Sequence, residues 1–177
     1  MTVDELVAAD RAATEAFVRS CVFVGRVLDY GCGLQPYKAI VEAAGGEYVP
    51  FDRAGFRPRA LSRVPSTWAP ADVGSACVLA EAWDVILCTQ VAQYVADLPA
   101  LLAQFRQALS ACGGALVLTW PTCWPETFAG DGYRYTDWGM RTLAVEAGLA
   151  VERTVQLATH EAGDVVFALG YGMVARA

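Results

Sequence analysis

The sequence has a single histidine, His160, and none of its 6 cysteines forms a Cys-x-x-Cys pair. A zinc site built from histidine and paired cysteine ligands would therefore lack recognisable residues, and we expect no metal. The cysteines are scattered along the chain and do not suggest a disulfide framework. They are predicted to be reduced thiols.

Positive charge is also scarce. The chain carries 13 lysines and arginines against 19 aspartates and glutamates, which gives a formal net charge of -6. Binding nucleic acid by general electrostatic attraction needs a basic face, so no nucleic-acid partner is expected. No apolar run approaches the roughly 18 residues of a membrane helix, and residues 1–10 lack the form of a signal peptide. A cytoplasmic protein without membrane contacts is the expectation.

The chain is rich in apolar residues, and its strand and helix patterns alternate. Its 177 residues suit one domain, and 55% of them are hydrophobic. Thr2 and Glu5 have the spacing of a capping box, so residues 1–25 are predicted to form an N-terminal helix and its lead-in. Residues 26–177 form the main domain. The alternation predicts an α/β fold with a mostly parallel sheet.

One motif organises the chain. An apolar run ends in Asp29 and is followed by Gly31, Gly33 and a helical pattern. This order predicts a strand, a tight turn and a helix N-terminus, which together hold nucleotide-like ligands because glycines let a ligand approach the backbone closely. A glycine pair alone is also common in ordinary turns.

A second apolar run ends in Asp52, about 20 residues after the glycines, which is the spacing of the dinucleotide-type fingerprint. A carboxylate at that position can accept hydrogen bonds from both hydroxyls of a ribose. The alternative is that Asp52 caps a helix or faces solvent at the end of a strand.

The wording Val-Leu-Asp-x-Gly-Cys-Gly at residues 27–33 resembles the first motif of the class I S-adenosylmethionine-dependent methyltransferases. Pro36 and Tyr37 are similar to the small type 11 branch of that family, and the resemblance extends to about residue 176. It implies a single-domain, Rossmann-like, doubly wound sheet of seven strands in the order 3-2-1-4-5-7-6, with the last strand antiparallel. It also implies that the N-terminal helix lies over the cofactor mouth, the alternative being that it only covers the sheet edge.

The resemblance further implies S-adenosylmethionine as cofactor, with S-adenosylhomocysteine as product. The glycine loop would meet the amino-acid end of the cofactor, Asp29 its ammonium, Asp52 the ribose and Asp72 the adenine. Asp72 also fits a plain helix N-cap. The expected cofactor-binding residues are Asp29, Gly31, Cys32, Gly33, Asp52, Arg53, Asp72, Val73 and Gln90.

The catalytic residues are harder to assign, because methyl transfer needs a general base only if the acceptor must lose a proton. The candidates are Tyr94, Tyr133, Tyr135 and His160. Residues 93 and 94 are Gln and Tyr where the resembled family commonly has Glu and His. The aromatic loop at residues 120–138 is expected at the same rim as the glycine loop, where it would wall an acceptor pocket, bury a dimer face or simply staple the loop.

The function predicted is in-line methyl transfer to a small-molecule acceptor, and a homodimer is left open. One alternative is a catalytically silent member of the fold that binds the cofactor or a partner subunit. It is favoured by Gln93, Tyr94 and a glutamine at position 35 where many relatives have glycine. A less favoured alternative is an NAD(P)-dependent oxidoreductase or epimerase. That class needs a third glycine, where this chain has Pro36, and a Tyr-x-x-x-Lys pair that is missing.

Overall fold

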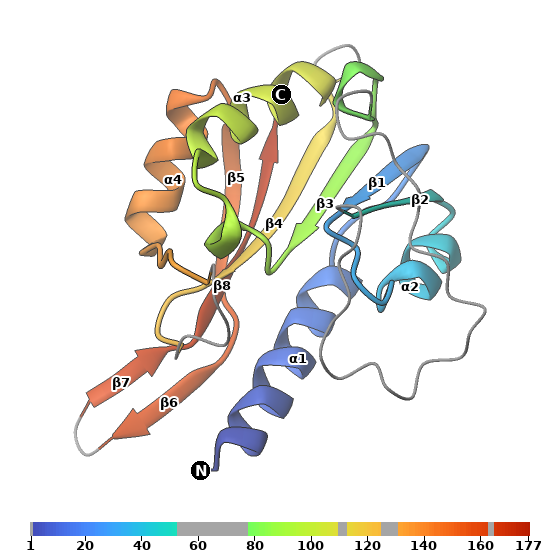
Figure 1. The fold of residues 1–177 in the computed structure, drawn as a ribbon. Coiled ribbons are helices and arrows are strands. Elements are labelled where there is room, and N and C mark those ends of the chain that lie inside the picture. Colours follow the sequence, from blue (N-terminus) through green and yellow to red (C-terminus); the bar gives the residue numbers. More distant parts are fainter. Residues whose placement is uncertain (1, 53–77, 110–112, 125–130, 163–164) are drawn as a thin grey trace.

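The computed structural model describes residues 2–52, 78–109, 113–124, 131–162 and 165–177 (Figure 1). Within these ranges the helices are α1 (Val3–Arg19), α2 (Lys38–Ala43), α3 (Leu98–Leu109) and α4 (Asp137–Glu146), with short 3-10 helices η1 (Val78–Ala80) and η2 (Ala92–Tyr94). The strands are β1 (Arg26–Tyr30), β2 (Glu47–Phe51), β3 (Val85–Thr89), β4 (Ala115–Pro121), β5 (Ala150–Gln156), β6 (Thr159–Ala162), β7 (Val165–Ala168) and β8 (Gly170–Arg176).

The central sheet has the strand order β2-β1-β3-β4-β8-β5. Strands β2, β1, β3 and β4 are parallel, whereas β8 is antiparallel to both β4 and β5. This is the expected doubly wound order without its third strand. The described residues therefore contain six of the seven expected strands in the expected order, and the third strand of that order is expected within residues 53–77, which lie outside them.

Side chains of the central strands alternate between two apolar layers, as the period of two in a strand requires. On β3, Ile86 packs in a cluster with α3 and α4, whereas Leu87 packs in a cluster with α1 and α2. Every residue of β3 and β4 is buried, which explains why their sequences are continuous apolar runs. Each fully buried aliphatic side chain contributes about 2 kcal/mol through the hydrophobic effect.

Helix α1 begins where the sequence predicted. The backbone N–H of Thr2 donates to Glu5 Oε2 at 2.6 Å, and the N–H of Glu5 donates to Thr2 Oγ1 at 3.3 Å, which completes the capping box. Near its other end, Phe17 is buried so tightly against Gly172 of β8 that an added Cβ there would lie 2.6 Å from the Phe17 ring. This close contact holds α1 along the edge of the site.

The segment between β5 and β8 departs from the prediction. It was expected to be a connection without strong periodicity, but β6 and β7 form an antiparallel hairpin in which His160 pairs with Phe167. Figure 1 shows this hairpin extending past the end of the central sheet, on the side where α1 begins. Val166 and Phe167 are neighbours in the chain and both are exposed. The strands therefore show little of the alternation of apolar and polar residues from which a strand is predicted.

Candidate functional site

The glycine loop leaves β1 at Tyr30 and turns with Gly31 at φ 80° and Gly33 at φ 50°. These left-handed angles are strained for residues with a side chain, so the two glycines make the turn possible. At Gly33 an added Cβ would meet no atom of the described chain within 4 Å, which leaves open space beside the backbone. This side of the loop can therefore be approached closely by a ligand.

The N–H groups of the loop bond to the end of β2. Those of Gly31 and Cys32 donate to the carbonyl of Phe51 at 2.7 and 3.0 Å, and that of Gly33 donates to Asp52 Oδ2 at 2.8 Å. Asp52 is buried and so fixes the loop in addition to facing the cavity next to it. These three N–H groups already have partners within the protein. The loop therefore contributes its shape, and not these hydrogen bonds, to the binding of a ligand.

Asp29 lies behind the loop, fully buried, and lines neither cavity described below. Its Oδ2 accepts the hydroxyl of Tyr48 at 2.6 Å, while Oδ1 has no partner among the described residues. Burial raises the pKa of the Asp29 carboxyl to about 7; the Tyr48 hydrogen bond opposes this shift and the charge of Asp52 adds to it. This part of the site therefore contains a buried acid without a basic partner among the described residues.

Two cavities meet at the glycine loop and share Gly31, Gln90 and Tyr94 in their walls. The smaller, about 210 Å³, is otherwise lined by aromatic and aliphatic side chains and one carboxylate: Tyr30, Phe51, Asp52, Val91 and Val95. This combination suits a flat ring system that carries hydroxyl groups.

The larger cavity, about 650 Å³, is enclosed by four segments. They are α1, the glycine loop with the residues after it, the turn after β3 and the loop after β4. Besides the three shared residues, its walls consist of Val7, Asp10, Arg11, Glu15, Cys32, Gly33, Leu34, Pro36, Tyr37, Thr89, Gln93, Pro121, Trp124 and Asp131. Helix α1 therefore lies over the mouth of the site, which decides between the two positions considered for it.

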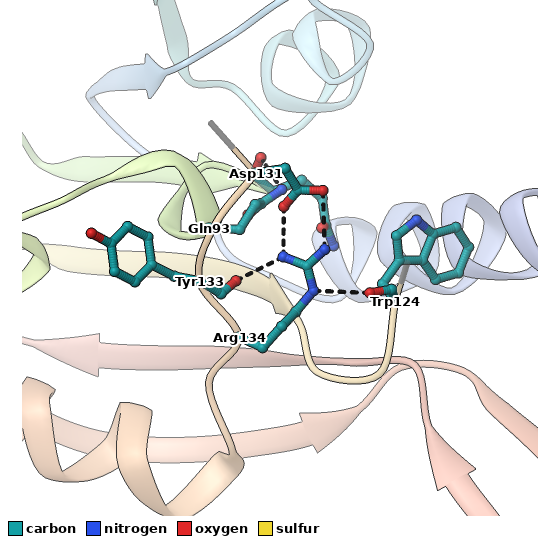
Figure 2. Close-up of polar contacts among 6 residues, drawn as sticks. Gln93, Trp124, Asp131, Tyr133 and Arg134 are labelled. Carbon is teal, nitrogen blue, oxygen red and sulfur yellow. Dashed lines mark hydrogen bonds and ion pairs between the residues drawn. The ribbon is translucent and has the colours of Figure 1, made fainter. Parts of the chain in front are cut away.

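The loop after β4 is fixed by a buried ion pair (Figure 2). Arg134 Nη2 donates to Asp131 Oδ2 at 3.0 Å, Nη1 donates to Oδ1, and Nε donates to the carbonyl of Trp124 at 3.1 Å. The side chain of Asp131 is 2% exposed and that of Arg134 is 24% exposed. A bidentate pair of this kind orders both ends of the loop.

The same loop is joined to the turn after β3. The N–H groups of Gly132 and Tyr133 both donate to the backbone carbonyl of Gln93 at 3.2 Å. The Gln93 side chain is buried; its Nε2 donates to the carbonyl of Gln90 at 2.8 Å, and its Oε1 has no partner among the described residues. Gln90 itself has a left-handed φ of 55° and a buried Nε2 that is likewise unpartnered in the described chain.

The predicted site residues divide into four groups. The first group lines one or both cavities and consists of Gly31, Cys32, Gly33, Asp52, Gln90 and Tyr94. The second is Asp29, which lies behind them. Tyr133 and Tyr135 stack on each other with ring centroids 6.4 Å apart and line neither cavity, and His160 lies in the β6–β7 hairpin. The remaining predicted residues, Arg53, Asp72 and Val73, lie outside the described residues.

Sequence reasoning missed several residues of the larger cavity. Val7, Asp10, Arg11 and Glu15 share one face of α1, so their helical spacing was the available signal. Asp131 also lines this cavity and had no comparable signal.

Several observations limit other chemistry at this site. The described residues include no group of three or more side chains that could hold a metal ion. Cys32 is a free thiol in the loop, and burial raises its pKa to about 12, so it is not a thiolate nucleophile at neutral pH. Among the helices in the described ranges, none is long and apolar enough to span a membrane.

The fold and the two cavities define an α/β protein that binds a nucleotide-like ligand at the carboxyl ends of its parallel strands. Residues 8–157 match the family described as Methyltransferase domain. The chain belongs to this family, within the class I S-adenosylmethionine-dependent methyltransferases. No curated protein matches the sequence.

Solved structures agree with this assignment of the fold. An S-adenosylmethionine-dependent methyltransferase from Mesorhizobium loti has 18% identity and a TM-score of 0.65, with 96% of this chain and 98% of that one covered. One from Archaeoglobus fulgidus has 13% identity and a TM-score of 0.66, covering 98% and 94%. Magnesium protoporphyrin IX methyltransferase from Synechocystis, with bound SAH, has 13% identity and a TM-score of 0.57, covering 99% and 88%.

Proposed function

We propose that the protein transfers the methyl group of S-adenosylmethionine to a small-molecule acceptor. The observation that supports this best is the pair of cavities that meet at Gly31, Gln90 and Tyr94. One cavity has the size and lining for an adenosine group, and the other extends from the same three residues under α1. A donor and an acceptor bound on the two sides would face each other at this junction.

The residues of the smaller cavity fit the nucleoside part of the cofactor. Tyr30 and Phe51 stack with ring centroids 4.8 Å apart and give the cavity an apolar wall, next to which Asp52 offers a carboxylate to the ribose hydroxyls. Gly33 leaves room for the amino-acid part, and the unpartnered Nε2 of Gln90 is a donor for its carboxylate. Asp29 adds negative charge behind the loop.

When bound, S-adenosylmethionine supplies an electrophilic methyl group on a sulfonium, whose sulfur leaves as a neutral thioether. The protein therefore has to align the acceptor and exclude water, and alignment alone can lower the barrier by several kcal/mol. Helix α1, Pro121 and Trp124 form the walls that would do this. Among the candidate bases, Tyr94 is at the junction and can hydrogen-bond an acceptor hydroxyl there.

A small acceptor is supported by the shape and charge of the larger cavity. Its volume of about 650 Å³ is within the range of small-molecule sites, and α1 and the loop after β4 close it on two sides. The net charge of -6 disfavours a nucleic-acid acceptor.

The test is calorimetric titration with S-adenosylmethionine and S-adenosylhomocysteine, with NAD and NADP as controls. We expect both sulfur ligands to bind with dissociation constants on the order of micromolar, and neither nicotinamide ligand to bind. Asp52→Ala should weaken binding by about 100-fold, because it removes the ribose contact and the acceptor for the Gly33 N–H. Asp52→Asn keeps an acceptor oxygen for that N–H and should lose less.

Circular dichroism of each variant provides the control for folding. A folded wild-type protein that binds neither sulfur ligand would overturn the proposal. If the ligands bind, production of S-adenosylhomocysteine in the presence of candidate acceptors identifies the substrate.

A further inference from the structure

The charged groups of the larger cavity are not balanced. The described residues of its walls carry the carboxylates of Asp10, Glu15 and Asp131 and one guanidinium, that of Arg11. Glu15 forms an ion pair with Arg19 at 2.7 Å, and Asp131 forms the ion pair with the partly buried Arg134. Asp10 makes no hydrogen bond or ion pair with any described residue, so its charge is available to a ligand.

Asp10 lies in the wall where α1 passes the end of β8. Its Oδ1 is 3.6 Å from the position that a Cβ on Gly170 would take, and the residue is partly buried. Burial raises the pKa of the Asp10 carboxyl, and the nearby Arg11 only partly offsets this. A carboxylate that loses bound water without gaining a hydrogen-bond donor is destabilised. A cationic ligand would offset this cost in free energy by pairing with the carboxylate.

Gln93 gives an independent indication on the same cavity. It is 4% exposed, its Nε2 already donates to the carbonyl of Gln90, and its buried Oε1 has no partner among the described residues. The amide cannot reverse its orientation without placing two oxygens against each other. An unpartnered buried acceptor in a cavity wall indicates a ligand with hydrogens to donate.

Trp124 is a third residue of this cavity that suits a cationic ligand. It lines the same cavity, and an aromatic ring can attract cations as well as apolar groups. The unpartnered donor of this region, Gln90 Nε2, is shared with the smaller cavity and is assigned above to the cofactor. Among the described residues of the larger cavity, a carboxylate, an amide oxygen and an indole are therefore available to the acceptor, in addition to the hydroxyl of Tyr94.

We propose that the methyl acceptor carries a protonated amine group, held by an ion pair with Asp10 and a hydrogen bond to Gln93, and that another atom of the acceptor, one with a lone pair, takes the methyl group while the sulfonium sulfur leaves as a neutral thioether. This rests on the proposed function, of which it specifies the substrate class. Phenethylamine, phenethyl alcohol and phenylacetate are suitable probes, because they share a ring and differ in charge from positive through neutral to negative.

The probes are titrated at pH 7.5 into protein saturated with S-adenosylhomocysteine, and binding is measured by calorimetry. We expect phenethylamine to bind at least about tenfold more tightly than the alcohol or the acid, the order of effect of one ion pair. Asp10→Asn should abolish this preference while S-adenosylhomocysteine affinity stays within about twofold. Asp4→Asn is the matched control, since it removes one charge from the exposed first turn of the same helix and should change neither.

Equal binding of the three probes, tighter binding of the alcohol or the acid, an amine preference that survives in Asp10→Asn, or no measurable amine binding would each overturn the proposal. The experiment separates this proposal from the one on which it rests. If S-adenosylhomocysteine does not bind but the free protein still selects phenethylamine through Asp10, the cation site is supported and the methyltransferase function is not.

Discussion

The two ends of the site each contain a buried aspartate, and the two are held in opposite ways. At the cofactor end, Asp29 is fully buried, and its one described partner is the neutral hydroxyl of Tyr48. At the acceptor end, Asp131 is almost as buried but is neutralised by both terminal nitrogens of Arg134. The first is an acid for which the described residues provide no opposite charge, and the second is part of a rigid ion pair.

This difference separates two ways of building a binding site. The cofactor end depends on backbone conformation at two glycines, and the acid behind them responds to pH. The acceptor end depends on side chains from distant segments, which the ion pair fixes in place. We therefore expect damage at the acceptor end to affect stability most, and damage at the cofactor end to affect ligand binding and pH dependence.

The largest effect is expected for Arg134→Met, which removes the guanidinium that is paired with the buried Asp131. Removing one partner of a buried ion pair costs about 4 kcal/mol in the free energy of unfolding. Urea denaturation measures this change. Variant protein that remains folded should still bind S-adenosylhomocysteine, because Arg134 lines neither cavity.

A double variant provides the control for this prediction. Arg134→Met combined with Asp131→Leu removes both charges and should recover a large part of the lost stability. A loss below about 1 kcal/mol in the single variant, as for an exposed pair, would show that the two ends do not differ in this way.

The next largest effect separates the two glycines of the cofactor loop. At Gly31 an added Cβ would lie 2.3 Å from Val91 Cγ2, in addition to the strain of a φ of 80°. Gly31→Ala should therefore lower the free energy of unfolding by about 3 kcal/mol, and Gly33→Ala, which meets no neighbour, by about 1 kcal/mol. Gly33→Ala should instead weaken S-adenosylhomocysteine binding by more than about tenfold, because the methyl group fills the space left for the ligand.

Combining Gly31→Ala with Val91→Ala removes the clash but keeps the backbone strain, so it tests which of the two dominates. Equal losses of stability for Gly31→Ala and Gly33→Ala would contradict the geometry of the loop. Calorimetry and urea denaturation on the same samples distinguish binding from folding.

The last prediction is a pH dependence from Asp29, which is the smallest effect when it is counted per pH unit. Its pKa is raised from 3.8 to about 7 in the folded protein. Between these values the folded state keeps a proton that the unfolded chain has lost, so the free energy of unfolding should fall as pH rises. The slope from this one group is about 1 kcal/mol per pH unit, and it ends above the folded pKa, where both states are ionised.

Asp29→Asn keeps an acceptor for the Tyr48 hydroxyl and does not titrate. The difference between wild type and this variant, followed by urea denaturation from pH 4.5 to 7.5, isolates the contribution of Asp29. Parallel curves for the two proteins would disprove the expected slope.

The strand and the turn of the glycine loop were largely predictable because their determinants are local. The strand, the glycines and Asp52 lie within about 25 residues and each depends on a backbone rule that the sequence displays. The hydrogen bonds from the N–H groups of the loop to Phe51 and Asp52 were not predictable, because they depend on the register between β2 and β1. The order of the described strands was predictable from the family resemblance.

The acceptor end was less predictable because α1, Gln93, Trp124 and Asp131 come from segments up to about 120 residues apart. The richness of residues 120–138 in aromatics indicated a wall, and Trp124 does line the cavity, but Tyr133 and Tyr135 pack on each other. Composition gives the number of rings in a loop but not the direction in which each points. The β6–β7 hairpin was missed because its short, exposed strands show no burial pattern.

The position of β8 has a consequence for how the protein is made. β8 pairs with β4 on one side and β5 on the other, although β5 precedes it in the chain. During synthesis β5 leaves the ribosome before its neighbour in the sheet exists, and it has no other partner in the described sheet. The sheet can close only after residues 170–176 have emerged, so a nascent chain stalled before this point would expose an open edge on β4 and an unpaired β5 to the quality-control machinery.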